Sequence, residues 1–256
     1  MRKDDFKYIY GPVSSWRLGI SLGIDLFSSK KICNFSCIYC QLGRTLVYAT
    51  KPKLYVKTAQ VISELKRLPH IKIDYITFSG SGEPSLAENL GEAIKAVKKL
   101  NIAPVAILTN STLFNQKNIR KDLSFADYVI AKLDAFSQAS LEKINRPAKT
   151  IRFDSILRGI RQFRHTFKGK FALQIMFVKK NKKDAKELAR LTKIIAPDEV
   201  QINTPLRTCA VKPLSKKEIE KIKKYFSGLN SFSVYDVRIK KVTAVSKKET
   251  LKRRGK

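Results

Sequence analysis

Three cysteines within a short segment, Cys33, Cys37 and Cys40, constrain this chain more than any other feature. Their spacing, CxxxCxxC, suits an iron–sulfur cluster in which the protein ligates three irons and leaves the fourth open. An open metal position can bind a substrate or cofactor directly. A zinc knot or a group of buried thiols is the alternative, but structural zinc sites use four ligands, and Cys209 and both histidines are far away in sequence. The pattern favours the three-cysteine cluster and leaves the zinc hypothesis open.

Length and composition indicate a globular protein. The 256 residues, 43% of them hydrophobic, are enough for one large domain or for one domain with a small appendage. No apolar run reaches the length of about 18 residues that a membrane helix needs, and the N-terminus lacks the apolar segment of a signal peptide. Four cysteines, three of them clustered, are not typical of a disulfide framework. We therefore expect a cytoplasmic protein without a membrane partner.

The charge is strongly positive. Lys and Arg number 52 against 21 Asp and Glu, which gives a net charge of +31. A field of this size attracts polyanions, of which nucleic acid is the commonest. The basic residues are spread along the chain, so solvated charge in a lysine-rich proteome is the alternative explanation. Residues 246–256 are predicted to be a basic, disordered tail.

Short β-rich runs alternate with amphipathic segments of helical period over most of the chain. Six such alternations predict an α/β fold with a parallel sheet, either an incomplete barrel or a doubly wound sheet. The expected strands are 20–25, 74–79, 104–109, 126–133, 171–178 and 199–203, and the expected helices are 58–68, 89–100, 116–123, 137–144, 152–167 and 184–195.

The flanking segments break this rhythm. Residues 1–17 are rich in aromatic side chains around a Gly-Pro pair, and we expect an irregular lead-in before a barrel at 18–208. Residues 209–245 contain a basic helical pattern and an alternating run, 232–239, which together predict a helix–strand cap.

Polar residues follow the predicted strands one after another. In parallel α/β folds ligands bind at the carboxyl ends of the strands, so these side chains are expected to converge on one mouth. Each has a structural alternative: a tight turn, a helix cap, an ion pair or a satisfied core polar group. Their shared location is the stronger evidence. The candidates are Gly80, Ser81, Gly82, Glu83, Thr109, Asn110, Ser111, Lys132, Asp134, Gln174, Lys179, Gln201, Asn203 and Arg207.

With these motifs the chain resembles the radical S-adenosylmethionine (SAM) superfamily. The resemblance rests on the three cysteines, on the Gly80–Pro84 loop one unit later and on the sixfold rhythm. Ser81 departs mildly from the family's commoner GGEP sequence. Further segments resemble a subgroup of uncharacterised radical SAM proteins akin to wyosine-tRNA synthases, although no cysteine for a second cluster precedes Cys33. These segments are YGPVSSWRLG at 10–19, CQLGRT at 40–45, GEPSL at 82–86, KLD at 132–134, INRP at 144–147 and INTP at 202–205.

The resemblance implies a partial (β/α)6 barrel of the TIM type that holds a [4Fe–4S] cluster. Cys33, Cys37 and Cys40 would ligate three irons, and SAM would chelate the fourth. Reduction by a ferredoxin- or flavodoxin-type donor would cleave SAM to a 5′-deoxyadenosyl radical, which abstracts hydrogen from the substrate. The implied SAM contacts are Gly80, Ser81, Gly82 and Glu83 at the amino group, Thr109, Asn110 and Asp134 near the ribose or sulfonium, and Gln201 and Asn203 near the adenine.

The substrate stays open at this stage. The net charge of +31 makes tRNA, or another RNA, the leading hypothesis. A peptide or small metabolite is the second hypothesis, with the charge as background. A non-catalytic iron–sulfur or zinc RNA-binding protein is the third, since a fold alone does not determine function.

Overall fold

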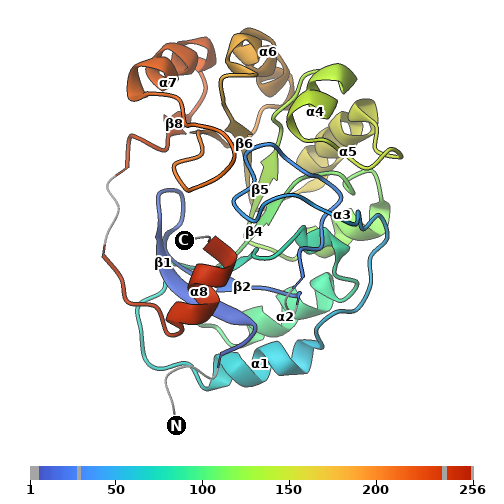
Figure 1. Ribbon diagram of the computed structural model, residues 1–256. Helices are drawn as coiled ribbons and strands as arrows, with labels where there is room; N and C mark the ends of the chain where they lie inside the picture. Colours follow the sequence, from blue (N-terminus) through green and yellow to red (C-terminus); the bar gives the residue numbers. More distant parts are fainter. Residues whose placement is uncertain (1–5, 28–29, 238–240, 255–256) are drawn as a thin grey trace.

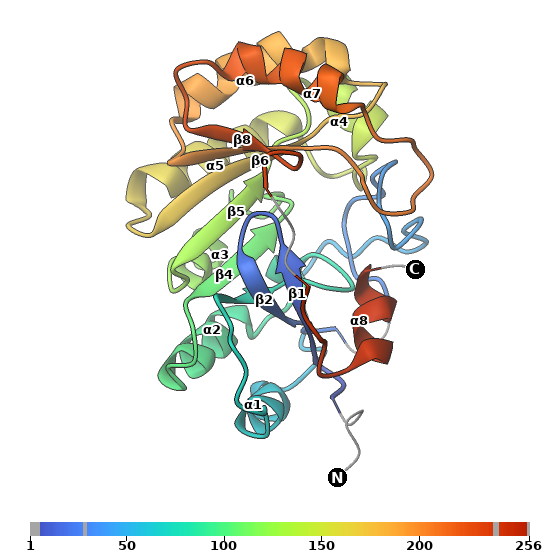
Figure 2. The same cartoon turned by 90° about the vertical axis from the view of Figure 1, so that its left-hand side faces the viewer.

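The structure is a computed structural model that describes residues 6–27, 30–237 and 241–254. One eight-stranded sheet forms its centre, with the strands in chain order. Figures 1 and 2 show the sheet curled into an open half-barrel with helices packed along its outer side. The strands are β1 (Ile9–Ser15), β2 (Gly19–Ile24), β3 (Tyr75–Phe78), β4 (Val105–Thr109), β5 (Tyr128–Lys132), β6 (Lys170–Met176), β7 (Glu199–Asn203) and β8 (Ser231–Ser233). The helices are α1 (Thr58–Lys66), α2 (Leu90–Lys99), α3 (Lys117–Leu123), α4 (Gln138–Ile144), α5 (Phe153–Thr166), α6 (Ala185–Ile195), α7 (Lys216–Lys223) and α8 (Lys247–Arg254).

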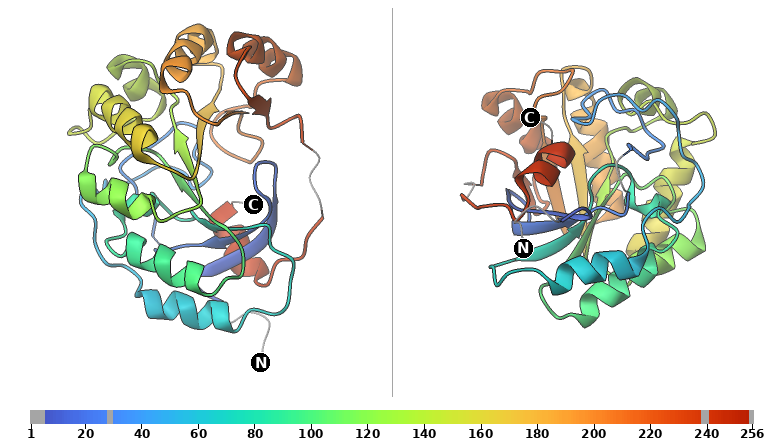
Figure 3. Two further views of the ribbon diagram at one scale, coloured as in Figure 1. Left: turned by 180° about the vertical axis from the view of Figure 1, so that it is seen from behind. Right: turned by 60° about the horizontal axis from the view of Figure 1, so that its bottom comes forward.

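Strands β2 to β7 are mutually parallel and correspond to the six predicted strands. The predicted fold class, an α/β partial barrel, is confirmed. Each parallel strand returns through a helix on the outside of the sheet, as Figure 3 shows from behind and from below. The carboxyl ends of the strands therefore lie along one edge, where the sequence predicted the site.

Amphipathic helices bury their apolar faces against the sheet. In α5 the residues Phe153, Ile156, Ile160 and Phe163 recur at helical spacing and are buried. The Phe163 ring lies 5.8 Å from that of Phe171 on β6, centroid to centroid, in an edge-to-face arrangement. Within the described ranges, no helix combines the length and the apolar character that crossing a membrane requires.

The expected irregular lead-in is wrong for residues 9–15, which form β1. This strand pairs antiparallel with β2, and its register shifts between Tyr10 and Val13. Gly11 and Pro12 occupy that irregularity. Both residue types are typical of turns, so they concealed a strand at the edge of the sheet.

The predicted C-terminal cap is partly different. Strand β8 covers only Ser231–Ser233 and pairs parallel with β7, so it extends the sheet rather than covering it. The end of the predicted strand, 238–239, lies outside the described residues. Strands β1 and β8 are the two edges of the half-barrel, and Trp16 bridges them by contacting Phe232 edge-to-face at 5.4 Å.

The expected disordered tail is wrong for Lys247–Arg254, which form α8. This helix packs against β1 (Figures 1 and 2). Arg253 is 2% exposed, and its Nε donates to Asp25 Oδ2 at 2.7 Å while Nη1 donates to Glu249. The helix has no apolar stripe, and pairing with two buried carboxylates replaces the hydrophobic contacts that a sequence pattern would reveal.

Candidate active site

The three cysteines lie on a loop after β2 that is paired with neighbouring loops. We call residues 30–49 the cysteine loop. Glu83 N donates to Ile32 O at 2.8 Å, and Ile32 N donates to Ser81 O at 3.1 Å, so the loop after β3 lies directly beside Cys33. A Cβ atom on Gly82 would lie 1.8 Å from Ile32 O. This close approach of two backbones explains the glycine at position 82.

The sulfur of each cysteine in the cysteine loop receives a hydrogen bond. Phe35 N lies 3.4 Å from Cys33 Sγ, Asn145 Nδ2 lies 3.3 Å from Cys37 Sγ, and Lys31 Nζ lies 3.2 Å from Cys40 Sγ. Donors of this kind stabilise negative charge on sulfur. The sulfurs are thus provided with the hydrogen bonds that a thiolate ligand set needs.

The protonated thiols are favoured when no metal is bound. Burial, and then the neighbouring Cys37, raise the pKa of Cys33 to about 12. Burial, and then Asp134, raise the pKa of Cys37 to about 11. A bound metal displaces such protons because the ligand is the thiolate. Within the described residues, no three His, Cys, Asp or Glu side chains, the three cysteines included, are placed to hold one metal ion.

Asp134 anchors the cysteine loop from behind. Its Oδ2 accepts from Tyr39 Oη and, at 2.9 Å, from Asn145 Nδ2, and its Oδ1 accepts from Met176 N at 2.7 Å. Lys132 Nζ lies 3.5 Å from Oδ2. Burial, and then the Asp134 charge, raise the pKa of Tyr39, which keeps that hydroxyl a donor. The carboxylate therefore holds Tyr39 and Asn145, which in turn contact the segment around Cys37.

Glu83 joins the loops after β3 and β4. It is 3% exposed and accepts from Thr109 Oγ1 at 2.6 Å and from Asn110 N at 2.6 Å, in addition to two bonds from Ser85. Burial raises its pKa, and these hydrogen bonds oppose the shift. Asn110 continues the network to Asn34 Oδ1 at 2.7 Å. The side chains of Glu83 and Thr109 thus fix the shape of the site wall.

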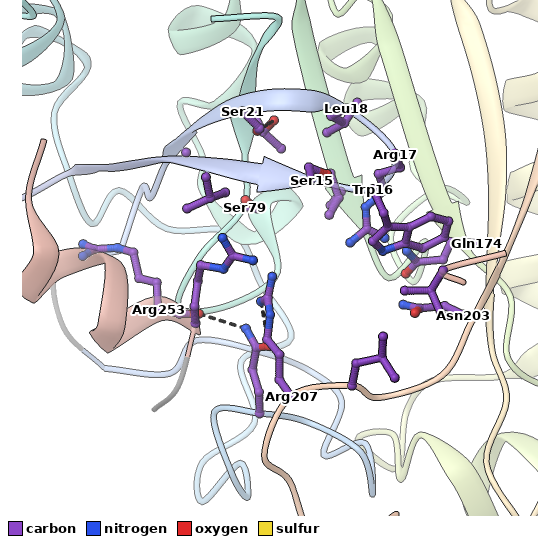
Figure 4. Close-up of a pocket in the computed structure, with 18 of the residues that line it drawn as sticks. Ser15, Trp16, Arg17, Leu18, Ser21, Ser79, Gln174, Asn203, Arg207 and Arg253 are labelled. Carbon is purple, nitrogen blue, oxygen red and sulfur yellow. Dashed lines mark hydrogen bonds between the residues drawn. The ribbon is translucent and has the colours of Figure 1, made fainter. Parts of the chain in front are cut away.

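A cavity of about 510 Å³ opens beside the cysteine loop (Figure 4). Tyr39 and Gln41, the neighbours of Cys40, line it together with Gly80 and Gly82. Of the predicted cofactor-binding residues, Gly80, Gly82 and Asn203 line this cavity, and a second group does not. The second group is Ser81, Glu83, Thr109, Asn110, Asp134 and Gln201, of which Asn110 and Asp134 line a smaller pocket beside Asn145.

Gln201 illustrates the second group. It is fully buried and donates to Tyr128 Oη and Glu199 Oε1, both at 2.8 Å. Gln174, one strand away, lines the cavity, and its buried Nε2 has no partner. Figure 4 shows Gln174 beside Asn203 and Arg17 on one side of the cavity.

Sequence reasoning missed Asp25, which follows β2 directly. Its Oδ2 accepts from Ser81 Oγ at 2.6 Å and from Arg253, so it ties the Gly80–Glu83 loop to α8. Its position at the carboxyl end of the predicted strand 20–25 was the available signal. Arg17 and Arg253 both line the cavity, but the sequence marks them only as basic residues among many.

Comparison with known proteins identifies the family. Residues 28–192, more than half of the chain, match the radical SAM superfamily. This chain belongs to the radical SAM superfamily. A UPF0026 protein of Synechocystis sp., slr1464, is 40% identical over 213 residues, which cover 83% of this chain and 79% of the relative. The predicted family is confirmed, and the radical SAM assignment makes the chain an S-adenosylmethionine-dependent enzyme.

Solved radical SAM structures share the fold. Streptococcus suis SuiB bound to S-adenosylmethionine aligns with a TM-score of 0.63 at 15% identity, over 82% of this chain and 50% of SuiB. Archaeal TYW1 aligns with a TM-score of 0.59 at 15% identity, over 86% of this chain and 74% of TYW1. At these identities the likeness shows the fold alone, and the chain spans about half the length of SuiB.

The residues present fit the two groups that the radical SAM family implies. The hydrogen bonds that the three cysteine sulfurs accept are expected for ligands of an iron–sulfur cluster and are not needed by buried structural thiols. The glycines at positions 80 and 82 leave backbone exposed along the cavity, where a small ligand can approach. The unpartnered Gln174 Nε2 is a buried donor that a bound ligand would satisfy.

Proposed function

We propose that this chain is a radical SAM enzyme that holds a [4Fe–4S] cluster on Cys33, Cys37 and Cys40 and binds SAM in the adjoining cavity. The observation that carries the proposal is the pairing of Ile32 with Ser81 and Glu83, which joins the cysteine loop to residues 80–83, the glycine loop, at the cavity. When bound, the cluster and SAM would supply one-electron chemistry for the abstraction of a hydrogen atom from the substrate.

The chain's own residues would bind SAM, support the cluster and exclude water from the site. The exposed backbone at Gly80 and Gly82 would receive the amino end of SAM, and Asn203 would face its adenine. Lys31, Asn145 and the Phe35 amide would stabilise the cluster sulfurs. Tyr39 and Gln41 would border the reacting atoms and keep water out, which protects a reactive intermediate.

The proposed substrate is a tRNA, with a ferredoxin- or flavodoxin-type protein as the electron donor. The net charge of +31 supports an RNA substrate, because each phosphate that is neutralised releases counterions. Binding of bulk tRNA is therefore expected to weaken steeply with salt. A flat salt response would favour a peptide or a small metabolite.

The test of the chemistry is anaerobic reconstitution with iron and sulfide, followed by dithionite and SAM. The wild type is expected to form 5′-deoxyadenosine, and Cys37→Ala is expected to lose both the cluster absorbance and the product. Cys209→Ala is the matched control, since that thiol lies outside the CxxxCxxC motif and donates to Val211 O. A stable cluster that gives neither product nor a SAM-dependent change in its EPR signal would support the non-catalytic hypothesis.

A further inference from the structure

The large cavity is lined by cations without matching anions. Arg17, Arg207, Arg253 and Arg254 all contribute to its wall, and the described residues that line it include no Asp or Glu. Arg253 is neutralised by Asp25 and Glu249. In the described part of the chain, the other three arginines form no ion pair. The cavity therefore carries an excess of positive charge that its own wall does not balance.

Arg17 is the clearest case. It lies in the turn between β1 and β2, with its guanidinium 5.0 Å from the Trp16 ring, and its buried Nε and Nη1 have no acceptor. Burial, and then the charge of Arg207, lower its pKa to about 10. A buried donor without a partner costs free energy, and such groups in native structures call for an explanation. A ligand oxygen would supply the missing acceptor.

Arg207 reaches the cavity from the segment after β7. Its Nη1 donates to the neutral Gln41 Oε1 at 2.8 Å, and Gln41 Nε2 donates to Arg253 O at 3.0 Å. Burial, and then the charge of Arg254, lower the pKa of Arg207 to about 10. Three elements distant in sequence thus direct guanidinium groups into one cavity, where a bound anion would reduce their mutual repulsion. Figure 4 shows Arg17 on one side of the cavity and Arg207 and Arg253 on another.

The position of these groups relates the anion to the reaction. Gln41 follows Cys40 directly, and the same cavity is lined by Gly80 and Gly82. SAM carries one carboxylate, which the family chemistry assigns to the cluster iron. Three unpaired guanidinium groups exceed what that carboxylate needs, and they match the oxygens of a phosphate, which Arg binds in a bidentate manner.

We propose that Arg17, Arg207 and Arg254 form a subsite for a phosphate group of the substrate. This proposal rests on the proposed radical SAM function, and it defines the substrate as a phosphorylated molecule. The phosphate belongs either to a free nucleotide or to an RNA strand. Trp16, beside Arg17, offers an aromatic face of the kind on which bases stack.

Binding to the reconstituted holoenzyme tests the subsite, with inorganic phosphate, pyrophosphate, GMP and bulk tRNA as probes in separate calorimetric titrations at fixed salt. Arg17→Gln and Arg207→Gln are each expected to weaken binding of the probe that fits by roughly 10- to 100-fold, the loss expected for hydrogen bonds to a charged group. Arg17→Lys, which keeps the charge, should lose less. Arg190→Gln is the matched control, because that exposed arginine on α6 pairs with Glu187.

The source of the phosphate is determined by which probe depends on the arginines. Sensitive binding of GMP identifies a nucleotide, and sensitive binding of tRNA with no GMP binding identifies an RNA strand. The proposal is overturned if no probe binds, if Arg17→Gln binds as the wild type does, or if SAM affinity, followed by EPR, falls as much as probe affinity. Formation of 5′-deoxyadenosine by the same wild-type preparation shows separately whether the proposed function holds. Unchanged melting temperatures exclude misfolding as the cause.

Discussion

The two sides of the cavity differ in how completely their polar groups are satisfied. Beside the cysteines, the carboxylates of Glu83 and Asp134 each accept several hydrogen bonds from neighbouring loops. Opposite them, the donors Arg17 Nε and Nη1 and Gln174 Nε2 are buried without partners, whereas beside the cysteines the acceptor Asn145 Oδ1 is a buried atom without one. A satisfied network holds one conformation, whereas unsatisfied donors are stable only if something else completes them. The side with Glu83 and Asp134 therefore positions the cysteine loop, and the side with Arg17 and Gln174 has donors available for a ligand.

The largest effect is expected at Gly82, where the backbone beside the cysteines leaves no space for a side chain. In Gly82→Ala the new Cβ would collide with Ile32 O at 1.8 Å, so the glycine loop must separate from the cysteine loop. Cluster incorporation, measured by visible absorbance and iron content, should be lost. Gly43→Ala, in the cysteine loop, is the control, because nothing lies within 4 Å of its added Cβ and only strain of about 1 to 3 kcal/mol applies. Normal cluster content in Gly82→Ala would show that the loops are not held together as described.

Removing the buried cation that fastens α8 comes next. Arg253→Gln leaves Asp25 and Glu249 buried without their partner and should lower the free energy of unfolding by about 3 to 5 kcal/mol. Lys248→Gln, on the exposed side of the same helix, should change little. Chemical denaturation measures both. If Arg253→Gln loses no more unfolding free energy than Lys248→Gln does, the ion pairs of Arg253 do not hold α8 in place.

The same variant gives a pH dependence of known sign. Burial raises the pKa of Asp25, and the charge of Arg253 is the largest cause that opposes the shift. Without Arg253 the folded-state pKa rises further above the unfolded value, so folding takes up a proton. The deficit of Arg253→Gln relative to wild type should therefore shrink as the pH falls from 8 towards 5. A deficit that grows on acidification would contradict this assignment.

Asp134→Asn tests the anchor behind the cysteines. The amide keeps the shape but turns an N–H group toward a donor, either Met176 N or the pair Tyr39 and Asn145, which should cost about 1 to 3 kcal/mol of unfolding free energy. Iron retention should fall with it, because Asn145 also holds Cys37. The control is Asp154→Asn at an exposed position on α5. If stability and iron retention are unimpaired in Asp134→Asn, Asp134 does not anchor the cysteine loop.

The smallest effect has the opposite sign. Replacing an unpaired buried charge by an apolar side chain is often neutral or stabilising, so Arg17→Met should raise the unfolding free energy by about 1 kcal/mol without ligand. Added inorganic phosphate should stabilise the wild type and reduce the difference. Arg190→Met should show neither change. Destabilisation by Arg17→Met in ligand-free protein would mean that Arg17 has a structural role.

The fold was largely predictable because its signal is repetitive. Apolar runs such as 104–109 and helices with clear apolar stripes alternate six times, and the predicted parallel strands are confirmed. Strand β1 and helix α8 were not predicted from the sequence, for different reasons. Gly11 and Pro12 interrupt β1, and α8 is held by ions rather than by apolar contacts. A buried Arg253 and an exposed Arg190 look alike in a sequence.

The site was predictable in place but not in role. Topology puts Gly80, Thr109, Asp134 and Asn203 at one edge of the sheet, as expected. Which of them faces the cavity depends on side-chain partners such as Tyr39 and Met176, which no spacing rule connects to Asp134. The three cysteines remain the predicted cluster ligands. The grouping of Arg17, Arg207 and Arg254 around one cavity depends on elements far apart in sequence, so the sequence alone does not reveal it.

The pair formed by Asp25 and Arg253 also sets an order of events during synthesis. The two residues are separated by 228 positions in the chain. At roughly 5 to 20 residues per second, the ribosome delivers Arg253 about 10 to 45 seconds after Asp25. During that interval the nascent chain can pair β1 with β2 and form the cysteine loop, but Asp25 has no cation and the cavity lacks one wall. A chain that has not reached residue 254 therefore carries the proposed cluster ligands without the complete pocket.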